Sequence, residues 1–209
     1  MPAREHIAAV QQACAESAPP FTPETDVLSA ASCGRLSAAL TAATRAGTPV
    51  AVLHLLCHGS AAGTTFGLAF DTEDGDGGCA VDDAGRMRQL LEPFAATLPL
   101  VVLAACDSGN SGAPGNQRGS VAQALHRIGI ASGVASRYPL SAAGSIRLAK
   151  ILYRQILVEL SSLESALLAA RQELTQDPQV LDWASLQVYS RPVAAEPDTR
   201  PVEFRPFRG

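Results

Sequence analysis

The chain has few charged and aromatic residues and no apolar run long enough to cross a bilayer. Charged residues make up 17% of it and the formal net charge is −4, so we expect no basic surface for a phosphate backbone. The N-terminus lacks the uninterrupted apolar stretch of a signal peptide. These absences predict a cytoplasmic protein with no membrane partner and no direct nucleic acid partner.

The 209 residues contain five cysteines, an odd number, and none of them forms a CxxC pair. This pattern favours reduced thiols over a disulfide framework or a zinc site. His54, Cys57 and His58 are close in sequence, but on a strand His54 and Cys57 point to opposite faces, which argues against a shared metal.

The acidic segment "DTEDGDGGCAVDD" (71–83) has acids near the spacing of a calcium loop. However, Thr72 occupies the first ligand position and an aspartate replaces the final glutamate. A solvated acidic loop is therefore the favoured interpretation. We predict no metal site and no cofactor for the chain.

Hydrophobic residues make up 47% of the chain, enough for one domain with a sizeable core. Apolar periodicity predicts helices near 4–17, 33–45, 83–96, 120–127, 145–160 and 163–174, and strands near 26–30, 49–59, 64–70, 98–106, 130–136 and 182–190. Alternating strands and helices predict an α/β fold with a mostly parallel sheet, covered by helices on both faces. We expect an N-terminal helix and Pro-rich connection (1–23), a core (24–191) and an extended tail (192–209).

Two apolar runs end in reactive side chains. "PVAVLHLLCHG" ends at His58 and Gly59, and "LPLVVLAAC" ends at Cys106. The carboxyl ends of parallel strands share one edge of a sheet, where ligands gather, so His58 and Cys106 are expected to lie close together. An imidazole activates a thiol, and the backbone N–H groups of Gly59 and Cys106 would form an oxyanion hole. Each residue viewed alone has a plainer interpretation, as a turn histidine or a buried thiol.

"VAVLHLLCHG" followed by "LVVLAACDSG" resembles the CHAT domain, a branch of the caspase–separase–metacaspase superfamily of cysteine peptidases. The resemblance continues through "SVAQALHRIGIASGVASRYPLSAAGS", "SLESALLAARQEL" and "DWASLQVYS" and covers about residues 24–190. It implies a caspase-like fold in which His58 is the general base or thiolate partner. Cys106 would be the nucleophile, and the reaction would be hydrolysis of a peptide bond in a protein substrate through a thioester acyl-enzyme.

The chain departs from those relatives that cleave after basic residues. They often carry an acid two positions before the nucleophile, where this chain has Ala104, and Ser141 stands where another acid would hold an arginine. Arg137 adds positive charge nearby. We therefore expect a small, apolar or acidic P1 residue. The candidate substrate-binding residues are Ala104, Asp107, Arg137, Tyr138 and Ser141, and a loop or helix-capping role for Asp107 is equally consistent with the sequence.

The resemblance also implies a missing element. Family members usually begin with a strand before the first helix, whereas this chain starts in the helix at about Arg4. Another segment, a partner chain or an upstream region would fill that place in the sheet. The family-level expectation is a bacterial effector, in antiviral defence or cell death, activated by a sensor partner. The alternative is a catalytically silent caspase-like module that needs a partner to complete its fold, although His58 and Cys106 are both retained.

Overall fold

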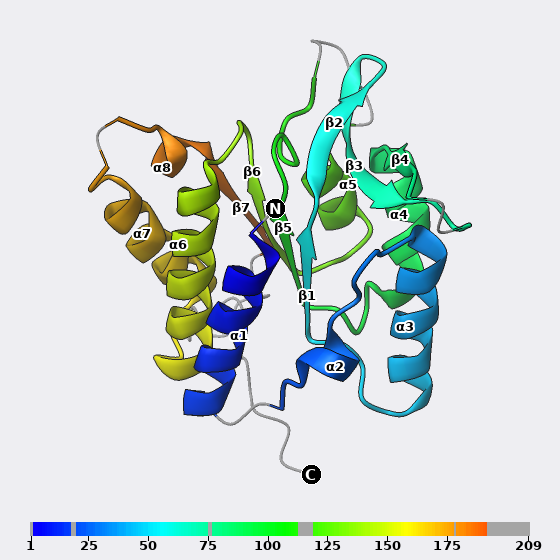
Figure 1. The fold of residues 1–209 in the computed structure, drawn as a ribbon, viewed down its shortest axis with the longest axis horizontal. Coiled ribbons are helices and arrows are strands. Elements are labelled where there is room, and N and C mark those ends of the chain that lie inside the picture. Colours follow the sequence, from blue (N-terminus) through cyan, green and yellow to red (C-terminus); the bar gives the residue numbers. More distant parts are fainter. Residues whose placement is uncertain (1, 18–19, 75–76, 113–118, 178, 192–209) are drawn as a thin grey trace. The chain divides into compact units, whose positions relative to one another are not determined.

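The computed structural model describes residues 2–17, 20–74, 77–112, 119–177 and 179–191. The chain forms two compact units. The sheet unit comprises Leu28–Pro139 and Gln187–Ser190, and the helical unit comprises Met1–Val27, Leu140–Leu186 and Arg191–Gly209. Figure 1 traces the elements of both units along the chain.

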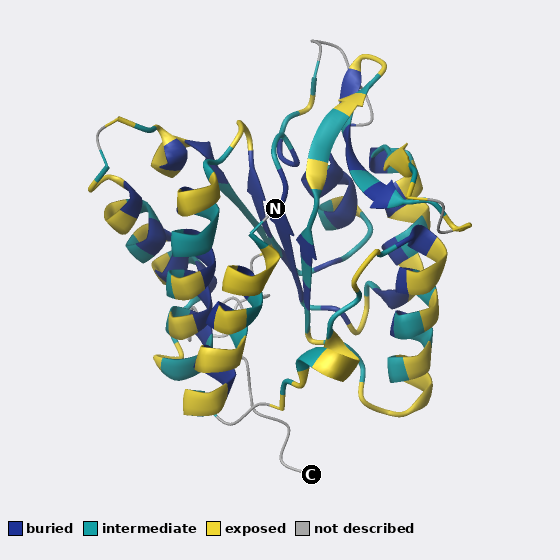
Figure 2. Ribbon diagram, in the orientation of Figure 1, coloured by how far each residue is buried: buried dark blue, intermediate teal, exposed yellow. Residues whose placement is uncertain are grey.

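The larger sheet has four strands in the order β1-β5-β6-β7. These are β1 (Val52–Leu56), β5 (Leu100–Ala104), β6 (Ser132–Ser136) and β7 (Leu186–Ser190). β5 lies parallel to both β1 and β6. Every residue of β5 is buried (Figure 2), which confirms that the second apolar run is a strand enclosed on both faces.

A second, antiparallel sheet of three strands has the order β2-β3-β4. It contains β2 (His58–Ala62), β3 (Thr65–Asp71) and β4 (Cys79–Asp82), with Gly63 at positive φ in the turn between β2 and β3. The sequence predicted one strand in the run 49–59, but the strand stops at Leu56 and a new one begins at His58. Cys79, assigned to an acidic loop, is the first residue of β4 because it pairs with Asp71.

Three helices complete the sheet unit, and each begins at a capping residue. They are α3 (Cys33–Arg45), α4 (Ala84–Leu91) and α5 (Val121–Arg127), and a 3₁₀ turn, η1 (Glu92–Phe94), follows α4. Ser32 caps α3, Asp83 caps α4, and Ser120 forms a capping box with Gln123 at the start of α5. Apolar side chains of these helices and of both sheets form one core, which includes Leu36, Leu53, Leu68, Met87, Leu103 and Leu125.

The helical unit contains α1 (Ala3–Ser17), α2 (Pro23–Asp26), α6 (Ala142–Tyr153), α7 (Leu163–Leu174) and α8 (Asp182–Ser185). A π-helical turn, η2 (Arg154–Val158), extends α6. α6 packs against both α1 and α7. His6 is buried in the α1 contact, where its Nε2 lies 3.3 Å from the Ser145 hydroxyl.

The predicted fold class is confirmed: the chain is mixed α/β, with a mostly parallel four-stranded sheet flanked by helices. Two further strand predictions were wrong. Residues 26–30 form no strand, because Pro23 starts the short helix α2 and the Asp26 carboxylate accepts the N–H of Thr22 at 2.7 Å. The closing strand begins only at Leu186, because Trp183 belongs to α8. The tail from residue 192 lies outside the described residues, and the domain boundaries stay a prediction.

Candidate active site

The strand register brings His58 and Cys106 to one edge of the sheet. β1 and β5 are aligned from Val52 opposite Leu100 to Leu56 opposite Ala104. His58 follows Leu56, and Cys106 follows Ala104, by the same two positions. Both residues therefore follow the carboxyl ends of neighbouring parallel strands, the edge at which ligands gather in such sheets.

Gly59 provides the direct contact between the two segments. A methyl group on Gly59 would overlap the carbonyl oxygen of Cys106 and stand 2.7 Å from its carbonyl carbon. Only glycine allows this approach of two backbones. The sequence suggested that Gly59 admits a substrate backbone, and the backbone that it admits in the structure is that of Cys106. An oxyanion-hole role for the N–H groups of Gly59 and Cys106 stays a prediction.

The other cysteines differ from Cys106 in surroundings. Burial raises the pKa of Cys57 to about 12, with smaller effects from the neighbouring Cys79 and Cys106 thiols. Burial and a 3.0 Å hydrogen bond to the Asp82 carboxylate raise the pKa of Cys33 to about 12. Burial also raises the pKa of Cys14. These three thiols are therefore protonated at neutral pH and are poor nucleophiles.

His58 is exposed and Cys106 is half-buried, so both are open to a substrate. Cys79 is also exposed. Chemical labelling of the protein must therefore separate Cys106 from Cys79.

The turn after Cys106 is closed by its own side chains. Asp107 has a positive φ of 56°, and its carbonyl oxygen accepts the N–H of Asn110 at 2.9 Å. The Asn110 side-chain amide donates to the Asp107 carboxylate at 2.9 Å and its oxygen accepts the N–H of Gly112 at 3.0 Å. A methyl group on Gly112 would overlap the Thr64 carbonyl oxygen, so this loop also contacts the turn between β2 and β3. The loop role foreseen for Asp107 is thus present, and a role in substrate binding stays a prediction.

Two buried serines fasten this turn to the end of β6. The Ser108 hydroxyl accepts the backbone N–H of Ser136 at 3.2 Å, and the Ser136 carbonyl accepts the N–H of Gly109 at 2.8 Å. The Ser136 hydroxyl lies 3.2 Å from the carbonyl oxygen of Ala105 and 2.8 Å from that of Tyr138. Sequence reasoning missed this pair. The only available signal was a serine at the end of each apolar run.

The substrate-binding candidates are divided between the units. Ala104 is buried at the end of β5 and presents no side chain to a substrate. Arg137 and Tyr138 are exposed just after β6, and the Arg137 guanidinium carbon lies 5.6 Å from the centre of the Tyr138 ring. These residues and Asp107 belong to the sheet unit, whereas Ser141 belongs to the helical unit.

Ser141 caps helix α6 and contacts an acid that sequence reasoning missed. Its hydroxyl accepts the N–H of Gly144 at 2.9 Å and donates to the Asp182 carboxylate at 2.5 Å. The Ser141 N–H donates to the same carboxylate at 3.0 Å, and Asp182 is only 4% exposed. No local pattern in the sequence could pair two residues so far apart.

Three acids of segment 71–83, namely Glu73, Asp82 and Asp83, serve as structural acceptors. Glu73 accepts the Ser32 hydroxyl and the Gly34 N–H, both at 2.6 Å, and these bonds lower the pKa of its carboxyl. Asp82 accepts the Cys33 thiol, and Asp83 accepts the N–H of Arg86 at 2.9 Å. Within the described residues, no group of three or more His, Cys, Asp or Glu side chains is placed to hold a metal ion.

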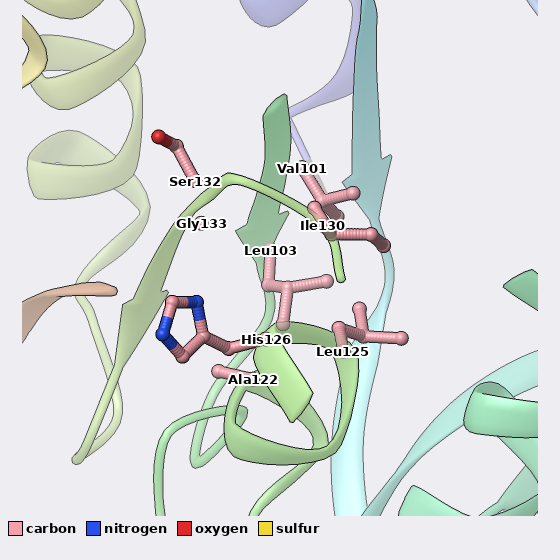
Figure 3. A pocket seen from close by; sticks show the side chains of 8 residues that line it. All are labelled: Val101, Leu103, Ala122, Leu125, His126, Ile130, Ser132 and Gly133. Carbon is pink, nitrogen blue, oxygen red and sulfur yellow. The ribbon is translucent and has the colours of Figure 1, made fainter. Parts of the chain in front are cut away.

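Figure 3 shows a small hollow between α5 and the strands β5 and β6. Its walls are the core side chains Val101, Leu103, Leu125 and Ile130, together with Ala122, His126, Ser132 and Gly133. The Ser132 hydroxyl points away from the hollow in Figure 3, and neither His58 nor Cys106 contributes to it. The hollow is thus a gap in core packing and separate from the Cys–His pair.

None of the helices in the described part of the chain is long and apolar enough to cross a membrane.

No curated protein matches the chain significantly. A family model, the CHAT domain, matches residues 2–191. That match spans nearly the whole chain and includes both His58 and Cys106, so this protein belongs to the CHAT domain family of caspase-like cysteine peptidases.

Proposed function

We propose that the protein is a cysteine endopeptidase in which His58 and Cys106 form the catalytic dyad. The observation that carries this proposal is the parallel register of β1 and β5, whose last paired residues, Leu56 and Ala104, stand two positions before His58 and Cys106. The contact of Gly59 with the Cys106 carbonyl supports it, because it leaves no room for a side chain between the two segments. The family match makes peptide hydrolysis the expected chemistry.

In the proposed reaction, His58 takes the thiol proton of Cys106 and the thiolate sulfur attacks the scissile carbonyl carbon. The backbone N–H groups of Gly59 and Cys106 stabilise the resulting oxyanion. The intermediate collapses as the C–N bond breaks, and His58 returns the proton to the leaving amine. A water molecule, deprotonated by His58, then attacks the thioester, which releases the carboxylic acid and restores the thiol.

The biological setting follows from the family alone. We propose a cytoplasmic bacterial effector with a protein substrate and an activating partner chain, in antiviral defence or cell death. A second candidate is a catalytically silent interaction module. β1 is an outer strand of the described four-stranded sheet, which leaves an edge that a partner strand could extend.

Alkylation of Cys106 by iodoacetamide distinguishes the two candidates. The exposed thiol of Cys79 would compete, so the parent protein for the test is Cys79→Ser. We expect a single fast-reacting thiol at neutral pH, mapped by mass spectrometry to Cys106. His58→Ala should slow it at least tenfold, since a thiol without its base reacts only through its small ionised fraction. A rate that His58→Ala leaves unchanged would favour the silent module.

The substrate is sought in a cell lysate incubated with the wild-type protein or with Cys106→Ala. New protein N-termini that appear only with the wild type identify the cleavage sites. Cleavage that persists with Cys106→Ala, in protein free of contaminating proteases, would contradict the assignment of the nucleophile.

A further inference from the structure

Arg137 follows the point where β6 is fastened to the turn that carries Cys106. The preceding residue, Ser136, is fully buried and hydrogen-bonded to the backbone of Ala105 and of Gly109. Ala105 and Gly109 flank Cys106 on its two sides. The backbone just before Arg137 is therefore fastened to the turn that carries Cys106.

The Arg137 guanidinium is exposed and already held in place. It lies over the Tyr138 ring, at 5.6 Å from the ring centre, a distance suited to a cation–π contact. Among the described residues, no carboxylate forms an ion pair with it. The neighbouring acid, Asp107, accepts the side-chain amide of Asn110 instead. Stacking on one face leaves the N–H edge of the guanidinium available to a bidentate partner.

The turn beside Cys106 presents no carboxylate that is free of hydrogen bonds within the turn for a basic substrate residue to bind. Ala104 is buried and apolar, and the Asp107 carboxylate is engaged within its own turn. A positive charge bound beside Arg137 would be repelled by the guanidinium, whereas a carboxylate would gain charge-assisted hydrogen bonds from it. The charge of Arg137 therefore favours an anionic group in the substrate, even though the Asp107 carboxylate lies in the same turn as Cys106.

We propose that Arg137 binds the carboxylate of an aspartate or glutamate at the P1 position of the substrate. The inference rests on the proposed function, because P1 is defined by the bond that Cys106 attacks. It makes Arg137 the residue that determines specificity, and Tyr138 the residue that positions the guanidinium.

Matched fluorogenic peptides that differ only in P1, with Asp, Asn or Arg, test the specificity. We expect kcat/KM for Asp to exceed that for Asn by about ten- to a hundredfold, the usual range for a hydrogen bond between charged groups. Arg137→Gln should abolish the difference, and Arg137→Lys should retain part of it. Arg137→Glu should reverse the preference in favour of the P1 Arg peptide, an effect that a purely structural role would not produce.

Arg45→Glu is the matched control. Arg45 is an exposed residue at the end of α3, just before β1, so it lies toward the opposite edge of the sheet from Cys106. The Arg45→Glu substitution changes the net charge by the same amount as Arg137→Glu and should leave the P1 preference unchanged. Equal cleavage of the Asp and Asn peptides by the wild type, or a preference for Asp that survives in Arg137→Gln, would overturn the proposal.

Binding to Cys106→Ala separates this proposal from the peptidase assignment. Fluorescence anisotropy with the labelled P1 Asp and P1 Asn peptides should show tighter binding of the Asp peptide, lost in the Cys106→Ala/Arg137→Gln double variant. If no peptide is cleaved by the wild type while this binding preference holds, the peptidase assignment fails and recognition of acidic residues stands. If cleavage occurs and neither binding nor kcat/KM depends on the P1 charge, only the proposal for Arg137 fails.

Discussion

Replacing Gly59 by alanine tests the contact on which the geometry of the site depends. The added methyl group would overlap the Cys106 carbonyl oxygen and approach the Cys106 Cα to 3.3 Å. Both obstacles are backbone atoms, so no rotamer change can relieve the overlap and one segment must move. Overpacking of this kind costs about 1–3 kcal/mol. A shift of about 1 Å between nucleophile and base costs on the order of a hundredfold in rate.

We therefore expect Gly59→Ala to lower kcat/KM by about a hundredfold, with a stability loss that leaves the protein folded at 25 °C. The assays are peptide cleavage, the alkylation rate of Cys106 and urea unfolding followed by circular dichroism. Gly133→Ala is the control, because Gly133 lies within β6 and a methyl group there would meet only the Val101 carbonyl oxygen, at an ordinary 3.7 Å. It should change neither cleavage nor alkylation.

Two results would refute the reasoning about Gly59. Wild-type alkylation and cleavage rates in a folded Gly59→Ala protein would refute the reasoning, because they would mean that Gly59 does not approach Cys106. A loss of activity accompanied by equal losses in Gly133→Ala would also refute it, since any added methyl group in the sheets would then have the same effect.

Three further predictions concern the turn, its anchor and the helical unit. Asp107→Gly should keep the alkylation rate of Cys106, whereas Asp107→Val should destabilise the protein by about 1–2 kcal/mol in urea, because a β-branched residue is strained at the positive φ of 56°. Ser136→Ala should cost about 1–3 kcal/mol in the same assay, since it removes the buried hydroxyl that donates toward the carbonyl oxygen of buried Ala105. Burial lowers the pKa of His6 below its usual 6.5, so its neutral form is favoured in the folded state. Stability should therefore be complete above pH 6.5 and fall as the pH drops below it, and urea unfolding at pH 7.5 and 5.5 should show a smaller difference for His6→Gln than for the wild type.

The elements predicted best from the sequence are those specified by local chemistry. Ser32 and Ser120 mark the starts of α3 and α5 because a serine hydroxyl accepts an N–H of the first helical turn. β5 could be recognised because a strand buried on both faces needs an unbroken apolar run. His58 and Cys106 could be predicted as site residues because each follows an apolar run. Ligands bind at the carboxyl ends of the strands in a parallel sheet.

The contacts that sequence reasoning missed join residues that are distant along the chain. Ser108 and Ser136 are 28 positions apart, and Ser141 and Asp182 are 41 positions apart. No propensity or periodicity relates such pairs, because each serine satisfies local capping or turn chemistry equally well without its partner. The break between β1 and β2 at Cys57 was missed for a similar reason, because it involves contacts with residues outside the apolar run. The run around it is apolar, yet after the break His58 and Gly59 pair with Ala69 and Leu68 of β3, which lie outside that run.

The proposed dyad lies where one sheet gives way to another, and this has consequences for its geometry. His58 belongs to the antiparallel sheet and is paired opposite Ala69 on β3, whereas Cys106 is held from the other side by the bonds of Ser136. The hairpin of β2 and β3 meets the Cys106 loop at Gly59 and again at Thr64. These two backbone contacts therefore fix the hairpin against the loop that carries Cys106. A substitution at either contact can change catalysis strongly while the buried core of the sheet unit, and most of the free energy of unfolding, is preserved.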